Sequence, residues 1–207
     1  MCAWTLVPIR GFSASKSRLQ SVLPLPARRA LNVGMLERVL EAVEGASDRA
    51  GHNPLAQCIV ISPDAETLTY ARFLGAQTLA EKSGIGLNAA LTLGRAYARR
   101  QGAKTLLVLA ADLPNVDADA LVRLYRAVPE GTAAVIADKS GYGTNGLVLP
   151  ASVNFVFSFG ERSFFRHCAG LERLGVSTQV WRDPGLAFDL DTAFDLVAWR
   201  ATQAGAD

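Results

Sequence analysis

The sequence lacks several features by which large classes of protein are recognised. Its three cysteines (Cys2, Cys58 and Cys168) are scattered and fit neither a disulfide framework nor the spacing of a metal site. The net charge of only +2 argues against a nucleic-acid partner bound by broad phosphate neutralisation. No apolar run approaches the roughly 20 residues that a membrane span needs, and the start, MCAWTLVPIR, reads as a strand rather than a signal peptide. We therefore expect a soluble cytoplasmic protein with no nucleic-acid or membrane partner.

What the sequence does contain is a regular alternation of apolar runs and helical patterns. Hydrophobic residues make up 50% of the 207 residues, which is ample for a core. The patterns predict strands at 3–9, 58–62, 76–80, 105–111, 133–138, 146–150, 176–181 and 186–191. They predict helices at 26–45, 64–75, 86–102, 117–127, 162–173 and from Thr192. Because continuous apolar strands alternate with helices, we expect one α/β domain over 1–207: a Rossmann-like, three-layer α/β/α arrangement around a mostly parallel mixed sheet, with a late antiparallel addition.

In such sheets ligands bind at the carboxyl ends of the strands, so the loops after the strands hold the candidate site residues. The loop RGFSASKSRL after the first predicted strand carries Arg10, Lys16 and Arg18 among small residues. Small residues let backbone N–H groups approach a phosphate, and the cations would neutralise it. The loop contains neither a Walker motif nor G-x-G-x-x-G, and an ordinary solvated basic loop remains the alternative.

Asp112 follows the most apolar predicted strand, in the stretch KTLLVLAADLPNVD. Its carboxylate should emerge at the ligand-binding edge, where Pro114 prevents further ladder bonding. The alternative is that Asp112 caps the next helix, but Asp117 and Asp119 are better placed for that role. We therefore expect Asp112 to bind a ligand, and a hard oxygen donor at this edge suits Mg²⁺ held together with substrate phosphates.

A second acidic pair, Asp189 and Asp191, lies near the end of the chain in LAFDLDT. On a strand, residues two apart point to the same face, so both carboxylates would lie together. Like charges beside Asp112 would repel unless a cation bridged them. This predicts Mg²⁺ between Asp112 and Asp189 or Asp191, although Asp191 could instead cap the final helix.

Two glycine- and serine-containing segments complete the candidate site. DKSGYGTNGLVLP (138–150) has the glycines of tight turns, and FGERSFFRH (159–167) places Ser163 at a predicted helix start, which suits an anion. A plain hairpin and a helix cap are the alternatives. His167 lies near this segment, either touching a substrate carboxylate or as an ordinary helix-face histidine, and neither it nor His52 needs a catalytic role.

The ordered set of segments resembles the guanylyltransferases that make the deazaflavin coenzyme factor 420 from 2-phospholactate or phosphoenolpyruvate. This family is related to the nucleotide-diphospho-sugar transferases, the GT-A-like nucleotidyltransferases. The first loop is less glycine-rich than in the wider superfamily. The segments that carry the resemblance are VPIRGFSASKSRL, GIGLNAALTLGRAYA, LVLAADLPNVDADAL, DKSGYGTNGLVLP, FGERSF and GLAFDLDTAFDL.

The resemblance implies a role for each matching residue. It implies catalytic roles for Lys16, Arg18 and Asp112, and Mg²⁺ held by Asp112 with Asp189 or Asp191. It implies that Thr144, Gly160 and Ser163 bind the phosphorylated acid. The nucleotide site that it implies consists of Pro8, Lys16, Arg18, Gly86, Leu87 and Asn88.

The implied reaction transfers GMP from GTP to the phosphate of 2-phospho-L-lactate, phosphoenolpyruvate or 3-phosphoglycerate and releases pyrophosphate. A substrate phosphate is already ionised at neutral pH, so positioning and charge neutralisation would supply most of the catalysis. The alternatives are a molybdopterin guanylyl- or cytidylyltransferase and a nonenzymatic nucleotide-binding protein. A GT-A glycosyltransferase is disfavoured because ADLP stands where Asp-x-Asp is typical. A homodimer is one candidate assembly.

Overall fold

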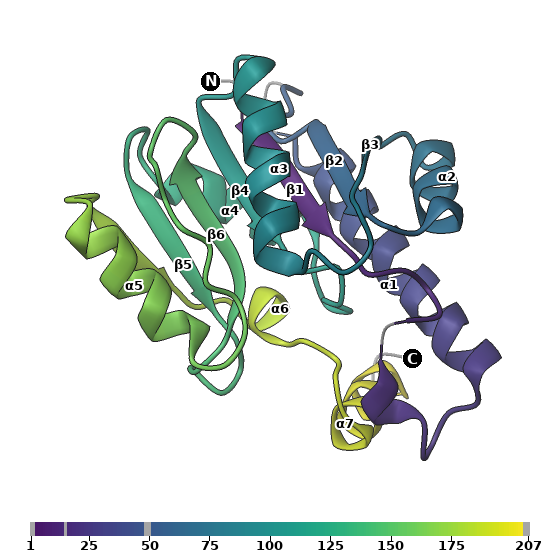
Figure 1. The fold of residues 1–207 in the computed structure, drawn as a ribbon. Helices are drawn as coiled ribbons and strands as arrows, with labels where there is room; N and C mark the ends of the chain where they lie inside the picture. The colour runs from purple at the N-terminus through teal and green to yellow at the C-terminus, as the bar shows by residue number, and fades with distance from the viewer. Residues whose placement is uncertain (1–2, 15, 48–50, 205–207) are drawn as a thin grey trace.

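The structure is a computed structural model that describes residues 3–14, 16–47 and 51–204, so Cys2 lies outside the described residues. A seven-stranded sheet forms its centre, in the order β3-β2-β1-β4-β6-β5-β7 (Figure 1). Strand β6 runs antiparallel to β4 and β5, and the other pairs are parallel. This confirms the mostly parallel mixed sheet. The strands are β1 (Ala3–Pro8), β2 (Gln57–Ser62), β3 (Gln77–Ala80), β4 (Thr105–Leu109), β5 (Ala133–Ala137), β6 (Thr144–Pro150) and β7 (Thr178–Trp181).

Helices cover both faces of the sheet, which confirms the three layers (Figure 1). Helices α1 (Leu25–Gly45), α2 (Ala65–Phe73) and α4 (Ala118–Ala127) pack on one face. Helices α3 (Leu87–Arg100) and α5 (Ser163–Arg173) pack on the other. None of the helices in the described part of the chain combines the length and the apolar character that a membrane span requires.

Strand β4 lies in the middle of these layers, and all its residues are buried. Leu107 and Leu109 belong to the core under α1 and α4, whereas Leu106 and Val108 belong to the core under α3 and α5. Alternate side chains of a strand point to opposite faces, so a strand covered on both sides has to be apolar throughout. The strand ends at Leu109, two residues earlier than predicted and well before Pro114.

Two aspartates cap helices as the sequence predicts. Asp64 accepts a hydrogen bond from the N–H of Thr67 at the start of α2 (3.0 Å). Asp117 accepts one from the N–H of Ala120 at the start of α4 (2.7 Å). Each bond satisfies a helix N–H that has no partner within the helix. Since Asp117 caps α4, the Asp112 carboxylate is available for another role.

The strand predicted at 186–191 is wrong. A short helix, α6 (Pro184–Ala187), occupies its first part, and an extended non-strand segment follows. Asp183 accepts hydrogen bonds from the N–H groups of Gly185 and Leu186, and Pro184 takes the first helical position, where its missing N–H does no harm. This capping signal outweighs the alternating pattern, so the argument that places Asp189 and Asp191 on one strand face does not apply.

The C-terminal helix α7 (Ala193–Ala204) packs beside the first loop and its 3₁₀ helix η1 (Ser17–Leu19) (Figure 1). A small apolar cluster joins them, in which Leu19 of η1 and Met35 of α1 pack with Leu190 and with Leu196 of α7. Thr192 caps α7: its hydroxyl accepts from the N–H of Asp195 (3.3 Å), whose carboxylate accepts from the N–H of Thr192 (2.7 Å). Asp191 is therefore not the cap.

Candidate functional site: a cleft at the carboxyl ends of the strands

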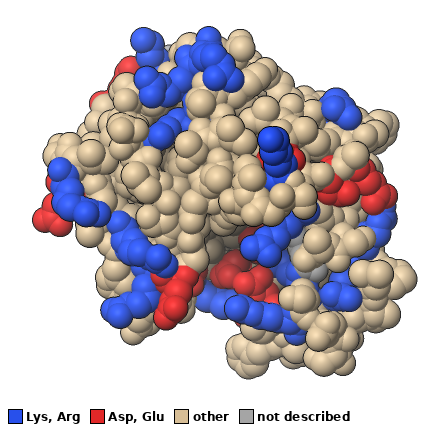
Figure 2. All heavy atoms as spheres, viewed as in Figure 1, with Lys and Arg blue, Asp and Glu red and all other residues tan. Residues whose placement is uncertain are grey.

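A cleft of about 890 Å³ opens where the strand order reverses, at the carboxyl ends of β1 and β4. Figure 2 shows this hollow, in which acidic side chains lie next to basic ones. Its position is the one that the sheet topology predicts for a ligand. Of the predicted site residues, Asn88 does not line the cleft; those that do are Pro8, Lys16, Arg18, Gly86, Leu87, Asp112, Thr144, Gly160, Ser163, Asp189 and Asp191.

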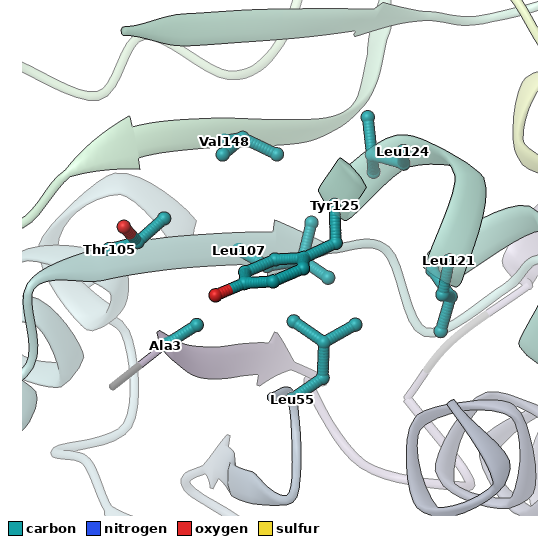
Figure 3. A pocket seen from close by; sticks show the side chains of 8 residues that line it. All are labelled: Ala3, Leu55, Thr105, Leu107, Leu121, Leu124, Tyr125 and Val148. Carbon is teal, nitrogen blue, oxygen red and sulfur yellow. The ribbon is translucent and has the colours of Figure 1, made fainter. Parts of the chain in front are cut away.

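A second cavity lies at the opposite, amino-terminal ends of the strands, between α4 and the starts of β1 and β4. Figure 3 shows the ring of Tyr125 beside Leu107, with Ala3 and Leu55 alongside. Its volume is about 10 Å³, which is about the size of a single probe sphere of water. It is a packing void in the core and cannot hold a substrate.

Lys16 is the centre of the cleft's charge. Its Nζ lies 2.6 Å from Oδ2 of Asp112 and 2.7 Å from Oδ1 of Asp191, and its side chain is only 3% exposed. Burial lowers the pKa of Lys16, but the carboxylates of Asp112 and Asp191 raise it more, so the net shift is upward. The ammonium therefore stays charged. Asp112 and Asp191 are 31% and 40% exposed and so can reach a ligand in the cleft.

The backbone at Lys16 is left-handed, with φ 61° and ψ 37°. This conformation is uncommon for a residue with a side chain and costs free energy unless the surrounding structure holds it. At the far end of the side chain, the two carboxylates fix the position of the ammonium group. Arg18, by contrast, has a side chain that is 74% exposed, with Nη1 3.8 Å from Oδ2 of Asp191. It is an exposed cation that lines the cleft, where it can meet an incoming anion.

The two aspartates of LAFDLDT face different partners. Asp191 meets Lys16, whereas Oδ1 of Asp189 lies 3.8 Å from Nζ of Lys139. Lys139 also donates to the carbonyl of Asp189 (2.8 Å) and to the carboxylate of Asp195 (2.5 Å). Burial raises the pKa of Asp189; Lys139 lowers it and the nearby Asp112 and Asp191 carboxylates raise it, with a net upward shift. Lys139 follows β5 at the same sheet edge, and the rule that pointed to Asp112 could also have found it.

The donor set suits a hard cation. Asp112 and Asp191 already converge on an ammonium ion, and Oδ1 of Asp189 is buried with no hydrogen-bond partner among the described residues. Within the parts of the chain that the structure describes, no three His, Cys, Asp or Glu side chains gather closely enough to hold a metal unaided. Mg²⁺ is usually held by one or two carboxylates together with substrate phosphates, so the residues present fit it.

Thr144, Gly160 and Ser163 bring no charged side chain to the cleft, and Asp138, next to Gly143, lines it as well. Thr144 opens β6, Ser163 opens α5, and both are buried at the cleft surface. Gly160 has φ 116°, a conformation that residues with a side chain rarely adopt. The N–H of Ser163 donates to the carbonyl of Gly160 (3.1 Å), which closes the turn into α5. We call Lys16, Arg18, Asp112, Asp189 and Asp191 the charged wall, and Thr144, Gly160 and Ser163 the neutral wall.

Asn88 connects α3 to the neutral wall. Its Nδ2 donates to the carbonyl of Phe159 (3.2 Å), and its Oδ1 accepts from the N–H of Phe159 (2.8 Å). Both ends of the amide thus hold the residue before Gly160. Buried Arg95, on the same helix, donates to the carbonyl of Phe155 (2.5 Å) and supports the same segment. A nucleotide contact by Asn88 stays a prediction. Sequence patterns gave no sign of these contacts, because they join residues 60 and 71 positions apart.

Comparison with known proteins adds the family. The family model described as "Guanylyl transferase CofC like" matches residues 2–199. The chain belongs to this family. It is 40% identical over 203 residues to a phosphoenolpyruvate guanylyltransferase of Rubrobacter xylanophilus, covering 98% of this chain and 95% of that one. It is 39% identical over 196 residues to a protein of the same name from Sphaerobacter thermophilus, covering 95% and 91%.

Solved structures confirm the fold of this guanylyltransferase family member. A nucleotidyl transferase of Methanothermobacter thermautotrophicus superposes with a TM-score of 0.69 at 18% identity, covering 100% of this chain and 99% of the other. CMP:2-keto-3-deoxy-manno-octonic acid synthetase complexed with CTP gives 0.62 at 14% identity and covers both chains fully, at 100% each. At such low identity the likeness shows the nucleotide-diphospho-sugar transferase fold and nothing about the substrate.

Proposed function

We propose that the protein transfers GMP from GTP to the phosphate of a small phosphorylated three-carbon acid and releases pyrophosphate. The family and its guanylyltransferase relatives support this reaction. The observation that carries it is the convergence of Lys16, Asp112 and Asp191 in a cleft that Thr144 and Ser163 also line. At about 890 Å³, the cleft lies in the volume range of ligand sites.

Phosphoenolpyruvate is the acceptor that the relatives' names favour. 2-Phospho-L-lactate and 3-phosphoglycerate carry the same phosphate and carboxylate and differ by a few atoms, so they are the alternatives. The product would be a diphosphate-linked guanosyl adduct of the acid. We assign this step to the biosynthesis of the deazaflavin coenzyme factor 420.

In the proposed mechanism, a phosphate oxygen of the acid attacks the α-phosphorus of GTP, and the bond to the pyrophosphate oxygen breaks. The attacking oxygen is already ionised, so the chain needs no general base, and none of the cleft contacts above assigns one. Lys16 and Arg18 would neutralise the triphosphate, while Thr144 and Ser163 would orient the acid in line with it. Positioning and charge neutralisation would supply the rate enhancement.

Mg²⁺ is the implied cofactor. Asp112 and Asp191 would hold it, with Asp189 as a further candidate ligand. It would supply charge neutralisation to the phosphate oxygens. For the ion to bind between Asp112 and Asp191, the ammonium of Lys16 would have to leave at least one carboxylate, and the triphosphate offers it a new partner.

The test is pyrophosphate release by the purified protein with Mg²⁺, crossing GTP, CTP and ATP with the three acids. We expect release with GTP and phosphoenolpyruvate and identify the adduct by mass spectrometry. Release with CTP or ATP in place of GTP would contradict guanylyl transfer. Silence with every acid, in a protein that binds GTP, would favour a nonenzymatic nucleotide-binding protein.

A further inference from the structure

His167 lies beneath the neutral wall, and the proposed chemistry leaves it unused. It sits on α5, one turn after Ser163, and its side chain is fully buried. The rings of Phe155 and Phe159 flank it, with centroids at 5.6 and 4.6 Å. It does not line the cleft. The sequence left two roles open for His167. This position argues against direct contact with a substrate carboxylate.

Both ring nitrogens of His167 have partners. The backbone N–H of Ser158 donates to Nε2 (3.0 Å), and Nδ1 lies 3.0 Å from the hydroxyl oxygen of Thr144. A backbone N–H can only donate, so Nε2 has to be the unprotonated nitrogen. Burial, and to a smaller extent the charge of Arg166, lowers the pKa of His167 to about 4, so the ring is neutral at neutral pH. The single ring proton is then on Nδ1.

This tautomer fixes the hydrogen-bond polarity of Thr144. Because Nδ1–H donates to the threonine oxygen, the threonine's own hydrogen has to point elsewhere. Among the described residues, none accepts a hydrogen bond from this hydroxyl, and Thr144 lines the cleft. Its hydroxyl hydrogen is therefore free to be donated to a ligand in the cleft, which suits an anionic oxygen.

We propose that His167 is a positioning residue that fixes the Thr144 hydroxyl as a hydrogen-bond donor to an anionic oxygen of the phosphorylated acid. This inference rests on the proposed function and deepens it, because it assigns recognition of an anion to an uncharged hydroxyl group of the neutral wall. Through Ser158, the same imidazole also anchors the segment that leads to Gly160. One buried ring thus contacts both Thr144 and the segment that leads to Gly160.

Two substitutions separate the two bonds. In His167→Asn the amide lies near the position of Nδ1 and can still donate to Thr144. In His167→Gln it lies near the position of Nε2 and can still accept from Ser158. A hydrogen bond to a charged group contributes enough that we expect His167→Gln to raise the KM for phosphoenolpyruvate about tenfold or more. His167→Asn should raise it by less than about threefold, and neither should change the KM for GTP.

A double-mutant cycle tests whether His167 acts through Thr144. Thr144→Val should raise the KM for phosphoenolpyruvate about as much as His167→Gln does, and adding His167→Gln to Thr144→Val should change it by less than about twofold. Thermal midpoints measured on every variant report any general loss of structure. Equal effects of His167→Asn and His167→Gln, or a full multiplication of effects in the double variant, would overturn the proposal.

The tautomer can be measured without any substrate. Long-range ¹H–¹⁵N NMR correlations of the imidazole at pH 7 should show a protonated Nδ1 and an unprotonated Nε2. The opposite tautomer, or a charged ring, would overturn the proposal whatever the kinetics. Absence of turnover with every acid would reject the proposed function instead, and the NMR result would still decide whether His167 donates to Thr144.

Discussion

The two walls of the cleft are prepared for anions in different ways. On the charged wall, Lys16 is held by Asp112 and Asp191, so its charge is already balanced before any ligand arrives. On the neutral wall, Thr144 and Ser163 carry hydroxyl groups without charge, and the nearby His167 is kept neutral by burial. A polyanion that arrives with a cation can exchange ion-pair partners on the charged wall. On the neutral wall, the inferred bond from His167 fixes the direction of the Thr144 donor in advance.

The difference suits two substrates that have unlike charge. A nucleoside triphosphate brings several negative charges. It can bind by taking Lys16 as a partner only if its own cation, such as Mg²⁺, takes the place of the ammonium beside the carboxylates. A small phosphorylated acid makes fewer contacts. Donors that are already oriented lower the entropy cost of ordering side chains when it binds. The comparison teaches that a search for charged side chains alone would have missed the residues proposed to bind the acid.

The largest expected effect is that of Asp112→Asn on the charged wall. Loss of this carboxylate should lower kcat by at least about 100-fold, the size seen when one electrostatic group is removed from an active site. The fold should remain, because the side chain is partly exposed and its backbone bond to Leu190 is unaffected. Steady-state pyrophosphate release measures kcat, and circular dichroism shows whether the fold is retained.

Asp117→Asn is the matched control. Asp117 caps α4, and asparagine caps helices about as well. This variant should keep wild-type activity. Wild-type kcat in Asp112→Asn, or an equal loss in both variants, would remove Asp112 from the catalytic machinery.

Lys16→Met should lower kcat/KM by about 100-fold, slightly less than the loss of the carboxylate, because Arg18 remains as a second cation. It also leaves Asp112 and Asp191 facing each other without the ammonium between them. Steady-state kinetics with varied GTP measures the loss. Activity equal to that of the wild type would show that the ion pair is structural only.

The neutral, buried ring of His167 beneath the neutral wall should make the stability of the protein depend on pH. Unfolded histidine takes up a proton near pH 6.5, whereas folded His167 does so only near pH 4. Between these values the unfolded state binds more protons, so stability falls as the pH is lowered. Between pH 7 and pH 5, the free energy of unfolding of the wild type should fall by about 2 kcal/mol more than that of His167→Gln. Urea unfolding at the two pH values measures it. The same pH dependence in both proteins would contradict a neutral buried ring.

The smallest expected effect is that of Asn88→Ala. Losing both bonds to Phe159 should lower the free energy of unfolding by about 1–2 kcal/mol, since the amide is only partly buried. The KM for the acid should rise more than that for GTP, because the bonds hold the segment before Gly160. Asn154→Ala, at an exposed position of the same segment, serves as control. A larger rise in the KM for GTP would favour the nucleotide contact predicted for Asn88.

The sequence predicts those parts of the site that depend on local rules. Asp112 was found because a fully apolar strand has to emerge at a known edge, and Asp64 and Asp117 because capping is local. The strand at 186–191 was wrong because Asp183 and Pro184 start a helix there. Lys16 meets Asp191 across 175 positions, and tertiary contacts bring them together: the packing of α7 against η1 and the backbone bond from Leu190 to Asp112. His167 and Asn88 were missed as positioning residues for the same reason: their partners are set by tertiary contacts.

The most direct test of the two-wall account is steady-state kinetics of Arg18→Met and Ser163→Ala, with GTP and phosphoenolpyruvate varied in turn. The account predicts that Arg18→Met raises the KM for GTP and leaves that for the acid unchanged. It predicts the reverse for Ser163→Ala, with a rise of about tenfold in the KM for the acid. Variants that shift both KM values equally, or that show the opposite pattern, would contradict it.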